Sequence, residues 1–144
     1  MASQSNIYVV DDDDAVRRGL RFLLKSAGYD PSLYESAVQF LASAAEVPPG
    51  CVITDVRMPD MDGVELARRL GAMGLGHQVV VITGHGDVQL AVEAMKAGAV
   101  DFLEKPFKDD LLLAAVDRAL QAEGRHSQSR AIQARFARPS MVDG

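Results

Sequence analysis

Short runs of apolar residues alternate along the chain with longer segments in which apolar residues recur every three or four positions. An uninterrupted apolar run of four to six residues, rich in β-branched side chains, is typical of a strand buried on both faces. The runs predict five strands, at residues 7–10, 31–34, 51–54, 78–83 and 100–103. The second is the weakest, and Pro31 favours a place near the edge of a sheet.

The segments that follow these strands have the spacing of amphipathic helices. Residues Val16, Leu20, Leu23, Leu24 and Ala27 fall on one helical face, and so do Val88, Ala91, Val92 and Met95. Asp13 or Asp14, Ser36, and Asp62 or Gly63 are suitable residues to begin three of the helices. We therefore expect five helices, the last from about residue 109 to residue 123.

Five strands that alternate with five helices predict an α/β fold. Continuously apolar strands joined by helical crossovers form a parallel sheet that is covered on both faces, a doubly wound arrangement. All the strands of such a sheet point the same way, and the crossovers are right-handed. Side chains that follow the strands therefore meet at one edge, although they are far apart in the sequence.

Composition and charge narrow the class of protein. The chain has 144 residues with a net charge of −5, and its one cysteine, Cys51, excludes an internal disulfide. No apolar run reaches the ~18 residues that span a membrane, and no signal-peptide pattern opens the chain. We expect a cytoplasmic protein without membrane contact. The acidic balance also argues against direct nucleic-acid contact by this domain.

The charge changes sign near Gly124. Residues 1–123 hold 11 Lys and Arg residues against 19 Asp and Glu residues, whereas residues 124–144 hold four arginines and one aspartate. We expect residues 1–123 to form one domain. Residues 124–144 are then a basic linker or tail, in part helical or disordered, and too short for a DNA-binding domain.

Polar residues close four of the predicted strands. The first strand is followed by Asp11 and Asp12, the third by Asp55, the fourth ends at Thr83, and the fifth is followed by Lys105. Carboxylates held a few ångströms apart raise one another's pKa unless a cation lies between them. Mg²⁺ prefers such oxygen ligands and is usually held by one or two carboxylates together with a phosphate. The set predicts a magnesium site beside a transferred phosphoryl group.

The same residues resemble a known family. Asp11-Asp12, Asp55 before a Met-Pro-x-x-Asp-Gly loop, Thr83-Gly84 and Lys105-Pro106-Phe107 look like the receiver domain of two-component response regulators, over about residues 5–123. The stretches 81–87 and 97–102 look most like the FixJ-type subgroup. The resemblance implies a flavodoxin-like (CheY-like) (βα)5 fold with strand order 2-1-3-4-5.

The resemblance also implies roles at the acidic end of the site. Asp55 matches the phosphoacceptor, which takes a phosphoryl group from a histidine of a sensor kinase. Asp12 matches the direct Mg²⁺ ligand, and Asp11 a residue that acts through water. The backbone carbonyl of Arg57 matches a further ligand of the ion.

Four further positions match the family's switch pair, its phosphate-binding lysine and its cis-proline. Thr83 matches the hydroxyl that moves toward the phosphoryl group, and Lys105 matches the lysine that binds the phosphoryl group. Phe102 matches the aromatic residue that turns when the hydroxyl moves, although a plain core role stays open. Pro106 matches a proline usually preceded by a cis bond.

The expected partners are a sensor histidine kinase and, through the fourth and fifth helices, a second copy of the chain. The output is expected to be transcriptional, through a domain absent from this sequence; the alternative is a single-domain regulator that acts by protein contact.

An aspartyl phosphatase of the haloacid-dehalogenase type is disfavoured, since Arg57 stands where that family has a second Asp. A nucleotide or flavin binder would need a Gly-rich loop after the first strand. A phosphate-independent scaffold would not need the acidic set. His77 and His126 are expected on the surface, and with His85 they show no metal-binding spacing.

Overall fold

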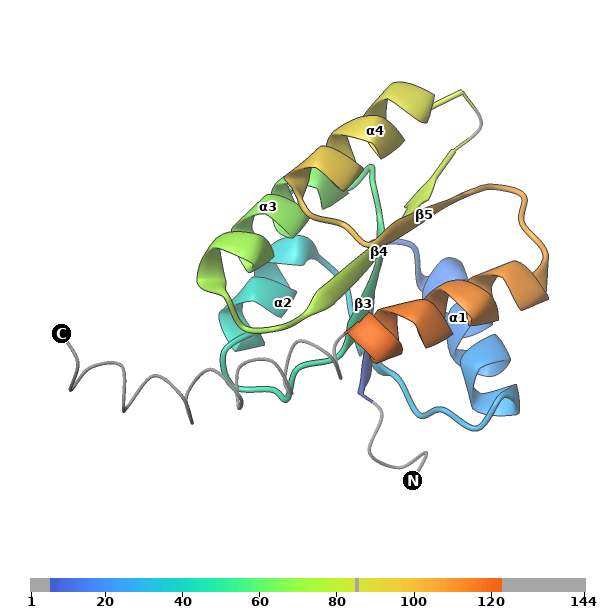
Figure 1. Ribbon diagram of the computed structural model, residues 1–144. Coiled ribbons are helices and arrows are strands. Elements are labelled where there is room, and N and C mark those ends of the chain that lie inside the picture. Colours follow the sequence, from blue (N-terminus) through green and yellow to red (C-terminus); the bar gives the residue numbers. More distant parts are fainter. Residues whose placement is uncertain (1–5, 85, 123–144) are drawn as a thin grey trace, which may run out of the picture.

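The architecture is a five-stranded parallel sheet with helices on both faces (Figure 1). The computed structural model describes residues 6–84 and 86–122; the predicted tail at residues 124–144 lies outside them. The strand order is β2-β1-β3-β4-β5, as the resemblance implied. The strands are β1 (Ile7–Val10), β2 (Ser32–Tyr34), β3 (Cys51–Asp55), β4 (Gln78–Thr83) and β5 (Asp101–Glu104). Each adjacent pair is parallel.

The helices divide between the two faces of the sheet. They are α1 (Asp14–Ser26), α2 (Ala37–Ser43), α3 (Gly63–Met73), α4 (Val88–Ala97) and a helical stretch at residues 109–122. Figure 1 shows α2, α3 and α4 on one side of the sheet, and α1 with the stretch 109–122 on the other. Within the described residues, no helix is both long enough and apolar enough to cross a bilayer.

Side chains that alternate in direction along each strand contribute to two hydrophobic cores, one on each face of the sheet. Tyr8 and Val10 of β1 pack toward α2 and α3, whereas Ile7 and Val9 pack toward α1 and the helix at 109–122. Successive side chains of a strand point to opposite faces, so a strand with helices on both sides must be apolar throughout. Cys51 is fully buried in this way, as expected, and burial raises the pKa of its thiol to about 12.

Local sequence chemistry sets several helix ends. Asp13 accepts hydrogen bonds from the N–H groups of Ala15 and Val16, and the side chains of Ser36 and Asp62 cap α2 and α3 in the same way. The helix α3 ends at Gly74, whose φ of +65° is a left-handed conformation that favours glycine. These caps agree with the sequence analysis.

The predicted buried face of α4 is confirmed at Ala91 and wrong at its three larger residues. Val88, Val92 and Met95 are 60%, 41% and 40% exposed, and the buried residues of α4 are Ala91 and Ala94. The small alanines let α4 approach the sheet and α3 closely, so the larger side chains one position away face outward. Ala27, expected on the inner face of α1, is likewise exposed at the end of that helix.

His77 is not the surface residue that the sequence suggested. Its Nε2 lies 2.9 Å from the carbonyl oxygen of Ala44, and its ring packs edge-on against Tyr8 and Phe40. Its Nδ1 is buried without a hydrogen-bond partner among the described residues. His77 thus belongs to an aromatic cluster with Tyr8, Tyr34 and Phe40 on the face of the sheet that α2 covers.

We predict that Phe40→Ala lowers the free energy of unfolding by about 3–5 kcal/mol, because it empties the centre of this aromatic cluster. Phe40 is fully buried, whereas Phe22 is 79% exposed. The matched control Phe22→Ala should therefore change stability by less than about 0.5 kcal/mol. Urea denaturation followed by circular dichroism measures both; similar losses for the two variants would contradict the packing described.

Candidate functional site

Asp55 and Lys105 meet across the carboxyl-terminal edge of the sheet. Asp55 is the last residue of β3, and Lys105 follows β5, with β4 between them. The Lys105 Nζ lies 3.4 Å from Oδ2 of Asp55, and their side chains are 40% and 17% exposed. The Lys105 N–H also donates to the Thr83 carbonyl at 2.8 Å, which extends the pairing of β4 and β5 to the site.

Asp11 is the buried acid of the site. It follows β1, is 2% exposed, and donates its N–H to the Tyr34 carbonyl of β2. Burial raises the pKa of the Asp11 carboxyl to about 6, and the charges of Asp55 and Asp12 add to that increase. The hydrogen bond from the Asp13 N–H, at 2.9 Å, and the charge of Lys105 act in the opposite direction.

Val10 of β1 pairs with Thr54 of β3, so the residues that follow them, Asp11 and Asp55, lie side by side at the same edge of the sheet. Asp12, Asp55 and Lys105 all lie close enough to influence the protonation of Asp11. Asp12 itself is exposed. Among the described residues, no three acidic, histidine or cysteine side chains converge closely enough to form a metal site by themselves.

The β3–α3 loop holds the second oxygen of Asp55. The Arg57 N–H donates to Oδ1 of Asp55 at 3.1 Å. Gly63 lies against the same strand end, where an added Cβ would come within 2.6 Å of the Asp55 carbonyl oxygen. The loop can therefore close over Asp55 only with glycine at this position.

Thr83 and Phe102 lie on the neighbouring strands β4 and β5. Thr83 is 1% exposed, and its hydroxyl donates to the Leu103 carbonyl at 3.3 Å. Phe102 is 41% exposed on β5, so its ring lies outside the core. The Lys105–Pro106 peptide bond is cis, as the sequence analysis expected.

Two basic residues hold the loops of the site through contacts that the sequence did not predict. Arg17 of α1 is buried, and its guanidinium donates to the Asp11 carbonyl at 2.6 Å and to Asp14 at 3.1 Å. The Arg57 guanidinium pairs with Asp87, just before α4. The three-residue spacing of Asp14 and Arg17 on one helix could have suggested that they pair. No local pattern indicates the Arg57–Asp87 pair, whose partners are 30 residues apart.

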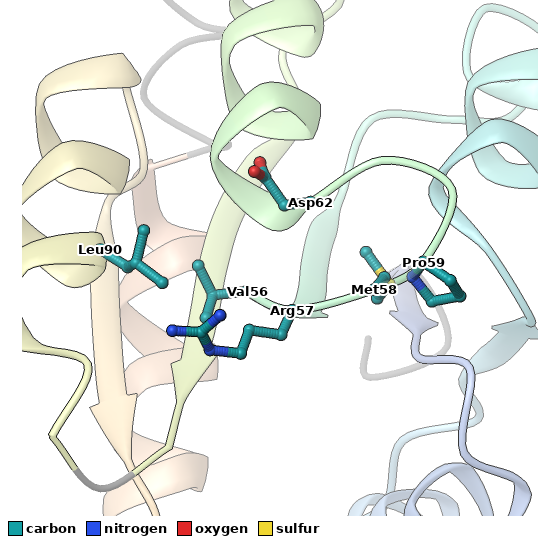
Figure 2. Close-up of a pocket in the computed structure, with 6 residues that line it drawn as sticks. All are labelled: Val56, Arg57, Met58, Pro59, Asp62 and Leu90. Carbon is teal, nitrogen blue, oxygen red and sulfur yellow. The ribbon is translucent and has the colours of Figure 1, made fainter.

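An open cavity of about 460 Å³ adjoins the β3–α3 loop. Figure 2 shows its lining residues, with the Arg57 side chain extending from the loop toward α4, where Leu90 faces the same space. The other lining residues are Val56, Met58, Pro59 and Asp62. The cavity separates the loop beside Asp55 from the first turn of α4.

The arrangement suits reactions of a phosphoryl group. A carboxylate oxygen of Asp55 is available as a nucleophile, and the ammonium of Lys105 beside it can neutralise charge on phosphoryl oxygens. The buried Asp11 and the exposed Asp12 give the site an excess of negative charge that a hard cation would offset.

The chain belongs to the response regulator receiver domain family. A model of that family, described as the response regulator receiver domain, matches residues 7–117. The sequence-based identification of the family is confirmed, and the strand order and helices agree with its solved structures.

The FixJ-type resemblance is also confirmed. The transcriptional regulatory protein FixJ of Bradyrhizobium diazoefficiens is 48% identical over 132 residues, which cover 92% of this chain and 64% of that protein. FixJ of Rhizobium meliloti is 52% identical over 113 residues, covering 78% and 55%. The crystal structure of FixJ-N superposes with a TM-score of 0.80 at 50% identity, covering 83% of this chain and 95% of that one. The chain thus spans a little over half the length of these two relatives.

We predict that Asp11→Asn stabilises the fold at neutral pH in metal-free buffer, by roughly 2 kcal/mol. The pKa of Asp11 is about 6 in the folded chain against an ordinary value of 3.8, so ionised Asp11 opposes folding above pH 6. At pH 4 the carboxyl is protonated in the folded chain and about half protonated in the unfolded chain, so most of the gain disappears. Denaturation curves at pH 4 and pH 7.5 measure the difference; a gain that is larger at pH 4 would contradict the burial of this acid.

Proposed function

We propose that this chain accepts a phosphoryl group on Asp55 from a sensor histidine kinase and thereby changes an output surface. The observation that supports it most directly is the Asp55–Lys105 pair, 3.4 Å apart at an edge of the sheet that also holds Asp11 and Asp12. Ion pairs on protein surfaces are common, but one surrounded by further acids is costly without a ligand.

The transfer needs little from the protein beyond position and charge. An Asp55 carboxylate oxygen forms a bond to phosphorus as the bond from phosphorus to the kinase histidine breaks, and the imidazole leaves with that electron pair. The Arg57 N–H holds Oδ1 of Asp55 and leaves Oδ2 as the attacking oxygen. Lys105, already beside Oδ2, stays with the phosphoryl oxygens as their charge develops.

The donor set also fits Mg²⁺. Asp12 and Asp55 would ligate the ion directly with the backbone carbonyl of Arg57, and Asp11 would act through water. One or two direct carboxylates are usual for Mg²⁺, which keeps several waters. When bound, the ion would supply positive charge to the phosphoryl oxygens. It would also offset the charges of Asp55 and Asp12, which add to the increase that burial causes in the pKa of Asp11.

Thr83 and Phe102 form the proposed switch. The Thr83 hydroxyl now donates to the Leu103 carbonyl, and a phosphoryl group on Asp55 offers it a charged acceptor instead. Movement of Thr83 toward Asp55 vacates space on β4 beside β5, into which Phe102 turns from its exposed position. The phosphoryl group then shifts the balance between two arrangements of this surface.

The output is proposed to be transcriptional. The curated relatives are named as transcriptional regulatory proteins, and this chain spans 55% to 64% of their length. Residues 1–123 would be the receiver, and residues 124–144 a linker to an output domain; a stand-alone regulator is the alternative. A second copy is proposed to bind at α4 and the helix at 109–122, where Val92, Met95 and Leu111 are exposed. A kinase partner of this kind implies a cytoplasmic location.

We predict that acetyl phosphate with Mg²⁺ adds one phosphoryl mass to the protein and that Asp55→Asn abolishes the addition, because the amide lacks the nucleophilic oxygen. The matched control is Asp30→Asn, an 87% exposed acid that precedes β2 at the opposite edge of the sheet. Intact-mass spectrometry measures both. Addition to Asp55→Asn at the wild-type rate would refute Asp55 as the phosphoacceptor.

A further inference from the structure

The helix α4 begins without a side-chain cap. Asp87 stands at its N-cap position, yet its carboxylate accepts no hydrogen bond from the first turn. Asp13, Ser36 and Asp62 stand in the same position of α1, α2 and α3, and all three accept such bonds. Aspartate is among the best N-cap residues, so a different interaction must occupy this carboxylate.

The Asp87 carboxylate is occupied by the guanidinium of Arg57. Its Nε donates to Oδ2 of Asp87 and its Nη2 donates to Oδ1, each at 2.9 Å. Both carboxylate oxygens are engaged, which leaves the first-turn N–H groups of α4 without them. The pair holds the pKa of Asp87 below its ordinary value and raises that of Arg57, mainly through these hydrogen bonds. Two-point pairing of this kind fixes the orientation of both partners.

The same arginine contacts the proposed phosphoacceptor. The Arg57 N–H donates to Oδ1 of Asp55 at 3.1 Å, and the charge of Asp55 acts on the Arg57 guanidinium. Arg57 therefore connects Asp55 to the start of α4. Beside this connection lies the cavity of about 460 Å³, with Leu90 of α4 on its wall, so the first turn has room to rearrange (Figure 2).

We propose that the Arg57–Asp87 pair is a latch that keeps the first turn of α4 uncapped until Asp55 is phosphorylated. This proposal depends on the proposed function for its trigger. A phosphoryl group brings a charge of roughly −1.5 to −2 and three acceptor oxygens to Asp55. It competes with Asp87 for the Arg57 guanidinium, and the released Asp87 carboxylate caps α4.

The latch gives Asp55 a route to the surface of the molecule that is separate from Thr83. The capped first turn would lie differently over the cavity, and Val88 and Val92, both exposed, would move with it. Asp87 is thus a positioning residue: it acts on the phosphorylation site through Arg57 and on the exposed face of α4 through the cap.

The test measures amide hydrogen exchange by NMR at Gln89 and Leu90, which occupy the second and third positions of α4. In the unphosphorylated chain, Arg57→Gln frees Asp87 to cap the helix, so these amides should exchange roughly fivefold more slowly than in the wild type. The double variant Arg57→Gln with Asp87→Ala removes the cap as well, and its exchange should return to the wild-type rate or exceed it.

The matched control is Arg69→Gln, which breaks a comparably exposed pair with Glu65 inside α3, also at 2.9 Å, and should leave Gln89 and Leu90 unchanged. Unchanged or faster exchange in Arg57→Gln would overturn the latch, whether or not Asp55 accepts phosphate.

The second arm adds acetyl phosphate and Mg²⁺ to the wild type. Exchange at Gln89 and Leu90 should slow to the level of unphosphorylated Arg57→Gln. If mass spectrometry shows the phosphoryl group on Asp55 and these amides do not slow, the coupling is refuted while the proposed function stands. If no phosphoryl group is found on Asp55, the proposed function is refuted, and so is phosphorylation as the trigger of the latch. The measurement on unphosphorylated Arg57→Gln still tests whether the Arg57–Asp87 pair keeps α4 uncapped.

Discussion

The burial of Asp11 beside further acids, at one edge of a parallel sheet, is the constraint on which the rest of this structure depends. Parallel strands all deliver their last residues to the same edge, and here those residues include Asp11, Asp12 and Asp55. Burial raises the pKa of the Asp11 carboxyl to about 6, and the charges of Asp55 and Asp12 add to that increase. Two interactions favour the ionised form of Asp11: the hydrogen bond from the Asp13 N–H and the charge of Lys105, which stands 3.4 Å from Asp55.

The loops around the site are held by interactions that keep other charges in place. The Asp13 carboxylate is occupied in capping α1, and that of Asp62 in capping α3, so neither competes for the site. The Arg17 guanidinium donates a hydrogen bond to the Asp11 carbonyl, and the Arg57 guanidinium joins the loop beside Asp55 to Asp87. Asp11 and Asp55 also have partners, the Asp13 N–H and Lys105, and a cation and a phosphoryl group would fit beside them.

Sequence pattern predicted the elements and the convergence of Asp11, Asp55 and Lys105, because strand ends in a parallel sheet must meet. It failed where partners are distant in the chain. The face of α4 was misassigned because close packing against α3 selects Ala91 and Ala94 over larger apolar residues. His77 and the Arg57–Asp87 pair depend on contacts 30 or more residues apart, which no local periodicity records.

The most direct measurement is NMR line broadening by Mn²⁺, a paramagnetic ion that occupies Mg²⁺ sites. If the acids form one ion site, small amounts of Mn²⁺ should broaden the backbone amides of Asp12, Arg57 and Lys105 together, and excess Mg²⁺ should restore them. Broadening confined to one of these loops, or spread over exposed acids such as Asp30 and Asp109, would contradict a single site shared by β1, β3 and β5.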